Sequence, residues 1–156
     1  MSTTVNPKSF KEFVQSFRDI CLAQMAVKHF QVGEPSDIDM QTNIDPFQRY
    51  PFVFLTPEIS SMDRFGKMSL GFTLVVADIV RNQEQWQIDT YNSTLMILQD
   101  ILSKVIMSPA SEVDYTVQTP VIIDPFVESY NNNLAGWSAA LTIDIKSPFN
   151  LCDAAF

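Results

Sequence analysis

Hydrophobic and polar residues alternate with a period of two over residues 137–146, near the C-terminal end of the sequence. Successive side chains of a β-strand point to opposite faces of a sheet, so this alternation predicts a strand with one apolar face and one mostly polar face. The apolar face carries Trp137, Ala139, Leu141, Ile143 and Ile145, and the other face carries Ser138, Ala140, Thr142, Asp144 and Lys146. The function of the strand depends on what its mostly polar face contacts.

Two longer segments, residues 7–27 and 83–107, repeat apolar residues at steps of three and four positions. This spacing places the apolar side chains on one stripe of an α-helix and predicts two amphipathic helices that dock on a sheet. An Asn-Pro pair at the start of the first segment suits a helix start, and Pro109 ends the second segment. Cys21 falls on the first stripe, and we expect it to pack as a small hydrophobic residue.

Several shorter segments predict further strands. They cover residues 28–32, 51–58, 68–81, 112–119 and 120–126, with Pro120 separating the last two. Residues 68–81 are apolar on both parities, which is typical of a central strand covered on both faces. Adjacent strands flanked by two helices favour an α+β fold with a mainly antiparallel sheet of four to five strands packed against two long helices. We expect one such domain over residues 1–156.

Two segments, residues 34–50 and 58–67, show neither period and predict long loops. Loops longer than about 12–15 residues are uncommon in compact domains unless they are functional or disordered. These two segments contain apolar residues without an obvious core face, namely Ile38, Met40, Ile44, Phe47, Met62 and Phe65. Two interpretations stay open: the loops reach onto a neighbouring subunit, or they pack against their own sheet.

The balance of charges restricts the partners of the protein. The chain has 18 acidic and 10 basic residues, and its net charge is −8. Proteins that wrap nucleic acid need clustered lysine and arginine for phosphate contacts, so this balance disfavours such binding. An acidic surface past which DNA slides by repulsion stays compatible with the charge.

The sequence offers no constellation for catalysis. His29 is the only histidine, and the four glycines do not form a phosphate-binding loop. Cys21 and Cys152 do not make a disulfide framework, and no spacing of a zinc site is present. We therefore expect no enzymatic activity, no metal and no cofactor. The first residues lack the pattern of a signal peptide, and no apolar run reaches about 18 residues, so we expect a cytosolic setting without a membrane span.

A resemblance rests on the order of several segments, which are an N-terminal amphipathic helix, the strand YPFVFLTP, a long strand leading into DTYNSTLMILQDIL, and the C-terminal third of the chain. In this last part a proline-aromatic strand end precedes acidic and Asn residues, a Gly-Trp pair and a final strand that ends in proline and cysteine. The residues in this order are Pro125, Phe126, Glu128, Asn133, Gly136, Trp137, Pro148 and Cys152. The order resembles small virion proteins of tailed phages, namely tail terminator and tail completion proteins and the ring proteins in the tails of crAss-like phages. The resemblance extends over residues 8–152. Asn131–Asn133 depart from it, because this family has more acidic residues there.

The resemblance implies a structural protein without catalysis that forms a six- or twelve-fold homo-oligomeric ring in a bacteriophage tail or head-tail connector. The implied neighbours are portal, connector and tail proteins, and phage DNA passes through the lumen without specific binding. The implied location is the tail or neck of a virion assembled in the host cytoplasm. Trp137 and Phe126 are candidate anchors at one end of the sheet, and Trp137 either covers the core or anchors a subunit contact. The alternative function is a small ligand- or peptide-binding module, which needs an apolar pocket.

Overall fold

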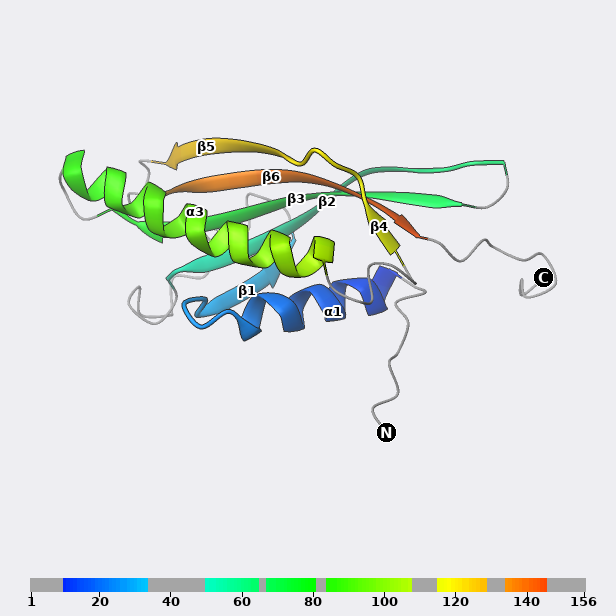
Figure 1. Cartoon of the computed structure of the whole chain (residues 1–156), viewed down its shortest axis with the longest axis horizontal. Coiled ribbons are helices and arrows are strands. Elements are labelled where there is room, and N and C mark those ends of the chain that lie inside the picture. The colour runs from blue at the N-terminus through cyan, green and yellow to red at the C-terminus, as the bar shows by residue number, and fades with distance from the viewer. Residues whose placement is uncertain are drawn as a thin grey trace.

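The computed structural model describes residues 10–33, 50–64, 67–80, 84–107, 115–128 and 134–145. These residues form, in chain order, α1 (Phe10–Ala23), β1 (His29–Val32), β2 (Phe52–Met62), β3 (Met68–Ile79), α3 (Glu84–Met107), β4 (Tyr115–Val117), β5 (Ile122–Glu128) and β6 (Leu134–Ile145). Both helices lie on the same face of the sheet and make a second layer (Figure 1). The α+β class expected from the pattern is therefore confirmed.

The sheet runs in the order β1-β2-β3-β6-β4, and β5 also pairs with β6. β1 is parallel to β2, and the other pairs are antiparallel. The described sheet has six strands, whereas the pattern predicted four to five. The division at Pro120 was expected from the sequence, and the strands on either side of it, β4 and β5, share β6 as their partner.

The main core lies between the sheet and the two helices. Phe13 of α1 is its aromatic centre, with ring centroids 5.2 Å from Phe72 of β3 and 5.5 Å from Tyr115 of β4. Alternate residues of β3 and β6 face this core, and so does the stripe of α3 that includes Leu98 and Ile101. The two amphipathic helices expected from the steps of three and four are thus confirmed in type and in the face that they bury.

α1 ends earlier than the pattern indicated, at Ala23 rather than at residue 27. The backbone N–H of Gln24 donates to Cys21 O and that of Val27 donates to Gln24 O, both at 3.2 Å, so the chain turns. The turn buries Val27 in the core and leads directly into β1. The residues of this turn are also compatible with a helix. A prediction from periodicity alone therefore places the end of the helix too late.

The face of the sheet opposite the helices, here called the open face, has two different halves. One half carries a second aromatic cluster, in which Tyr50, Phe52, Phe54 and Leu134 are buried and Val75 and Ile79 are half-buried. The other half carries small or polar side chains, which are Ser69, Thr73, Ser138, Ala140, Thr142 and Asp144. The expected central position of β3 is confirmed, because β3 lies between β2 and β6.

The predicted loop at residues 58–67 is wrong in its first half, because Glu58–Met62 continue β2 and pair with β3. Glu58 pairs with Gly71 and Ser61 pairs with Ser69, so β2 has one residue more than β3 between these two pairs. This extra residue forms a β-bulge, and the strands stay paired on both sides of it. The carbonyl of Ile59 occupies the space that a Cβ at Gly71 would need. Gly71 therefore permits the bulge, and the bulge hides the strand from a search for strict alternation.

Candidate interaction surfaces

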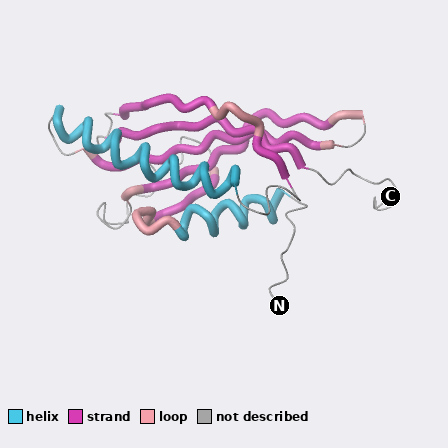
Figure 2. Tube along the Cα trace, viewed as in Figure 1, coloured by secondary structure: helices cyan, strands magenta, loops and turns pink. Residues whose placement is uncertain are grey.

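The first candidate surface is the outer hairpin, defined as the described residues 58–64 and 67–69. It continues β2 and β3 beyond the layer of helices, as the strand trace shows (Figure 2). The turn is held by a backbone hydrogen bond from Asp63 N–H to Lys67 O and by one from Lys67 N–H to Asp63 Oδ1, both 2.9 Å long. Gly71 N–H also donates to Ser60 Oγ at 3.0 Å, which fixes the bulge. The hairpin is thus a defined structure that stands away from the core.

The two faces of the outer hairpin differ in polarity. Met62 and Met68 are directly opposite each other in the ladder, and their exposed fractions are 64% and 40%. Ser61 and Ser69 form the neighbouring pair on the other face. Ile59, in the bulge, is 96% exposed. An exposed methionine pair on a two-stranded ribbon is a patch that a second chain can cover.

Polar side chains tie the base of the outer hairpin to the body. Ser69 Oγ donates a hydrogen bond to Asp144 of β6, and Gln118 Nε2 donates to both carboxylate oxygens of Asp144 at 3.2 Å. Thr73 Oγ1 donates to Glu58 Oε1 at 2.9 Å. These carboxylates accept hydrogen bonds from hydroxyl and amide groups, which is a structural use and not the arrangement of an acid–base pair.

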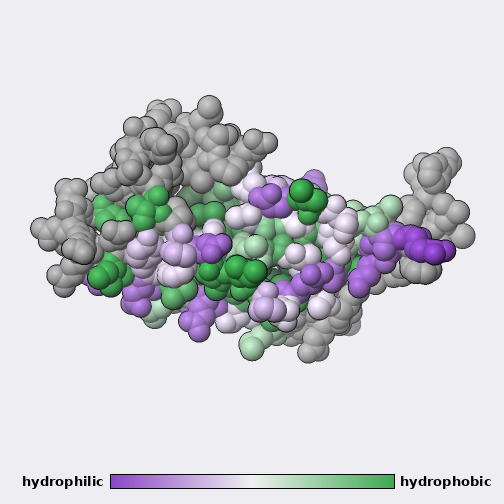
Figure 3. Space-filling view, turned by 90° about the horizontal axis from the view of Figure 1, so that it is seen from above, coloured by the Kyte–Doolittle hydropathy of each residue, from purple (hydrophilic) through white to green (hydrophobic). Residues whose placement is uncertain are grey.

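The second candidate surface is the α3/β5 groove, an open apolar depression of about 380 Å³. Its lining includes Leu95, Gln99, Leu102, Ile106, Met107 and Ile123. Met107, in the last turn of α3, is 81% exposed. Figure 3 views the molecule from the side of β5 and shows hydrophobic side chains gathered near the middle of this face, with hydrophilic ones at the projecting end. The groove is therefore separate from the outer hairpin.

The outer edge of β5 is a third exposed feature. In the described part of the chain, β5 pairs with β6 on one side only, and Ile122 and Val127 are exposed. Pro125 sits in the middle of the strand opposite Trp137 and lacks a backbone N–H. Proline in an edge strand blocks the addition of another strand. This edge is consequently a weaker candidate for pairing with a second chain than the groove beside it.

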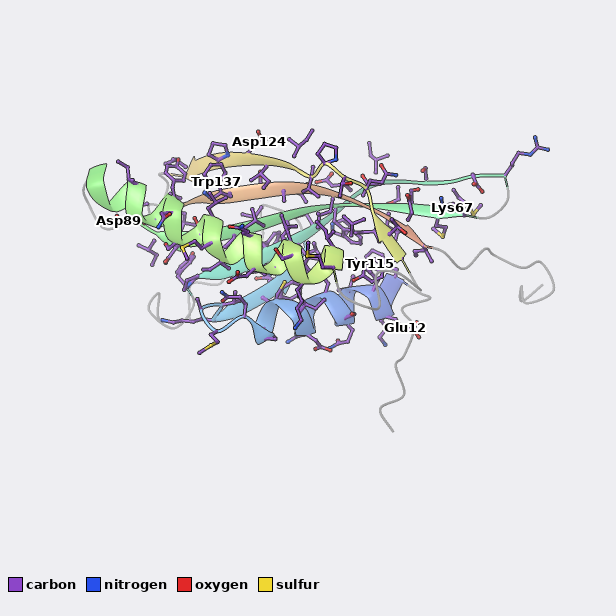
Figure 4. The ribbon with its side chains drawn as sticks, viewed as in Figure 1. Glu12, Lys67, Asp89, Tyr115, Asp124 and Trp137 are labelled. Carbon is purple, nitrogen blue, oxygen red and sulfur yellow. The ribbon has the colours of Figure 1, made fainter. Side chains whose placement is uncertain are left out.

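Trp137, one of the two predicted anchors, packs within the chain between β6 and α3 (Figure 4). Its indole Nε1–H donates to the carbonyl of Tyr91 at 2.9 Å, and the two rings meet edge to face with centroids 5.8 Å apart. The side chain is half-buried against the main core, so packing between strand and helix accounts for it. The side chain of Phe126, the other predicted anchor, lies outside the described part of the structure.

The described residues form no group of three or more His, Cys, Asp or Glu that could hold a metal ion. Cys21 is fully buried on the helix stripe, and burial raises the pKa of its thiol because the thiolate is poorly solvated there. It packs as the small hydrophobic residue that the pattern indicated. The ring of His29 stacks on Phe52 with centroids 5.3 Å apart.

The predicted interface residues fall into two groups. Ile38, Met40, Ile44, Phe47 and Phe65 lie outside the described residues, whereas Met62 lies in β2. The structure adds the α3/β5 groove, which the sequence interpretation missed. The sequence did contain a signal for this groove. Ile122 and Ile123 are consecutive residues of an edge strand, so apolar side chains lie on both of its faces.

No protein-family model matches the chain, and no curated protein matches it in sequence. Within the described residues, no helix combines the length and the hydrophobicity that a membrane crossing needs.

Proposed function

We propose that this protein is a structural subunit that assembles with its own copies into a ring in a bacteriophage tail or head-tail connector. One observation carries the proposal: the chain exposes two different apolar patches, the methionine face of the outer hairpin and the α3/β5 groove. A head-to-tail contact joins two different patches of neighbouring copies, and repeated rotation closes such contacts into a ring. Exposed apolar patches of this kind mark sites where proteins bind one another.

The assignment to a phage particle rests on the resemblance of the ordered segments over residues 8–152 to tail terminator, tail completion and tail ring proteins. The charge of the chain agrees with this use. Strand positions on the described open face include Glu58, Asp124 and Asp144 and no lysine or arginine. A face of this kind repels the phosphates of DNA that passes through a lumen. Portal, connector and tail proteins would then contact the two rims of the ring.

Mass measurement over a wide concentration range, combined with negative-stain images, tests the proposal. We expect closed rings of six or twelve copies. Detection of the chain in purified phage particles, with a copy number per particle, gives an independent measurement. A protein that is present as one copy per particle, or that is absent from particles, contradicts the proposal.

The second candidate function is a small ligand- or peptide-binding module. The α3/β5 groove favours it, because a volume of about 380 Å³ lies within the range of ligand pockets. Under this alternative the protein stays monomeric and binds an apolar probe such as 8-anilinonaphthalene-1-sulfonate saturably. Substitution Met107→Asp, in the lining of the groove, should then abolish binding of the probe.

A further inference from the structure

We infer that Met62, Met68 and Met107 are modification sites for peroxides, whose oxidation to the sulfoxide makes the outer hairpin and the α3/β5 groove polar and leaves the fold intact. The effect on assembly rests on the proposed function, because these two surfaces are the ones proposed to join the copies of the ring.

The structure keeps methionine apart from the core in the described part of the chain. Methionine is a common residue of hydrophobic cores. Here neither core cluster contains a methionine, and every described methionine is exposed. These residues are Met25, Met62, Met68, Met96 and Met107. An oxidant dissolved in water therefore reaches all of these side chains without opening the core.

Three of these methionines belong to the two apolar surfaces. Met62 and Met68 pair across the outer hairpin, so their side chains lie side by side on one face. Met107, the last residue of α3, lines the groove. Oxidation converts methionine from a flexible apolar side chain into a polar one. The same reaction thus places two neighbouring S=O groups on the hairpin and one in the lining of the groove.

The reaction needs only the methionine side chain and the peroxide. A lone pair of the thioether sulfur attacks one oxygen of hydrogen peroxide, an S–O bond forms, and the O–O bond breaks. The other oxygen leaves as water after proton transfer. The sulfur is oxidised by two electrons, and the peroxide is reduced by two electrons. The product, methionine sulfoxide, is the reversible step of methionine oxidation.

The core offers peroxide no comparable target among the described residues. Its only sulfur atom there is that of Cys21, which is completely buried. The thiolate is the form of cysteine that reacts with oxidants, and burial raises the pKa of the Cys21 thiol, so this form is scarce at neutral pH. Oxidation should therefore change the surface of the protein and preserve the packing beneath it.

Peroxide treatment of the unmodified chain and of two matched leucine variants tests the inference. The surface variant carries Met62→Leu, Met68→Leu and Met107→Leu, and leucine keeps an apolar side chain of similar volume without sulfur. The remote variant carries Met25→Leu and Met96→Leu and keeps the three methionines of the two surfaces. Peptide mass spectrometry identifies the sulfoxides. Circular dichroism and the melting temperature report the fold.

The unmodified chain and the remote variant should respond to peroxide in the same way. Their melting temperatures should change by only a few degrees, because exposed side chains contribute little to folding stability. Their self-association, measured by analytical ultracentrifugation, should weaken by at least about tenfold, because burial of one methionine side chain contributes that factor or more. The surface variant should associate equally well before and after treatment.

Reversal of the modification is a further readout. Treatment of the oxidised chain with the two methionine sulfoxide reductases, one for each sulfoxide epimer, and a dithiol as reductant should restore self-association. Failure of this repair, although mass spectrometry shows reduced methionine, would overturn the inference.

The other outcomes separate this inference from the proposed function. Unchanged association of the unmodified chain with all three surface methionines oxidised overturns the inference and leaves the ring proposal standing. Unfolding by peroxide, or equal loss of association in the surface variant, also overturns it.

An unmodified chain that stays monomeric at every attainable concentration overturns the ring proposal. The modification sites are then tested by retention on a hydrophobic-interaction column, which needs no assembly. Peroxide should shorten the retention of the remote variant more than that of the surface variant. Equal changes in the two variants overturn the modification sites as well.

Discussion

The inner and outer halves of strands β2 and β3 use the same pairing but have opposite environments. In the inner half, Val53 and Leu55 of β2 and Leu74 of β3 are completely buried under the helices. In the outer half, Ile59, Met62 and Met68 are exposed. The sequence pattern of apolar residues on one face continues through both halves, apart from the bulge. The same pattern thus makes a core where helices cover the sheet and an exposed apolar surface where the strands extend further.

The limit between the two halves follows from the positions of the helices. Phe10, the first residue of α1, stacks on Phe72 with ring centroids 5.8 Å apart, and its exposed fraction is 46%. The helix layer therefore ends near Phe72, and Met68 lies beyond it. Residues before this limit pack in the core of the chain, whereas the apolar residues beyond it are exposed.

Substitution Phe13→Ala tests the inner half and has the largest expected effect. Phe13 is buried and contacts Phe17, Phe72 and Tyr115. Truncation of a buried phenylalanine leaves a cavity, and it should lower the free energy of unfolding by about 3–5 kcal/mol. Urea denaturation followed by circular dichroism measures the change.

Phe10→Ala is the matched control for this measurement. Phe10 stacks on the same Phe72 ring but is half-exposed, so its truncation should lower the free energy of unfolding by less than about 2 kcal/mol. Equal losses for the two variants would contradict the position of the limit between inner and outer halves.

Substitution Gly71→Ala tests the junction of the two halves. A Cβ at this position meets the carbonyl of Ile59, and the backbone of the bulge has to move. Such overpacking should cost about 1–3 kcal/mol and should loosen the pairing between the strands of the outer hairpin. Hydrogen exchange of the amides in the outer hairpin should accelerate more than that of the inner half.

Ser61→Ala, in the same hairpin, introduces no atom beside the Ile59 carbonyl and serves as the control. We expect unchanged exchange in this variant. A Gly71→Ala protein with unaltered stability and unaltered exchange would show that the bulge does not depend on the missing side chain.

Much of the inner half could be predicted from the sequence because regular periodicity controls it. Steps of three and four located α1 and α3, and alternation located β6. These periods appear because the residues that face a core have to be apolar. The second strand of the hairpin was found for the same reason. The prediction was wrong at the turn after Ala23 and at the bulge at Ile59. At both places the structure depends on the geometry of the backbone and not on the burial of side chains.

The candidate surfaces were harder to predict, because each is formed by segments distant in sequence. Met62 was singled out as an apolar residue without a core face, and the structure places it on an exposed hairpin. The α3/β5 groove joins Met107 to Ile123 across a strand and a bend, and no local pattern reports this proximity. Trp137 could be placed on a strand, but its partner Tyr91 in α3 appears only in three dimensions.

Substitutions Met62→Ala and Met68→Ala test the outer half and have the smallest expected effect on folding. Exposed side chains away from caps and hydrogen bonds change stability by no more than about 0.5 kcal/mol, so the free energy of unfolding of the monomer should stay nearly constant. Under the proposed ring assembly, association should weaken at the same time, because the two substitutions reduce the exposed apolar surface of the outer hairpin. Urea denaturation at low protein concentration measures the first quantity, and ultracentrifugation at high concentration measures the second. A pair of substitutions that destabilises the monomer as strongly as Phe13→Ala would mean that the methionines belong to the core of their own chain, and the division of β2 and β3 into a folding half and an assembly half would be wrong.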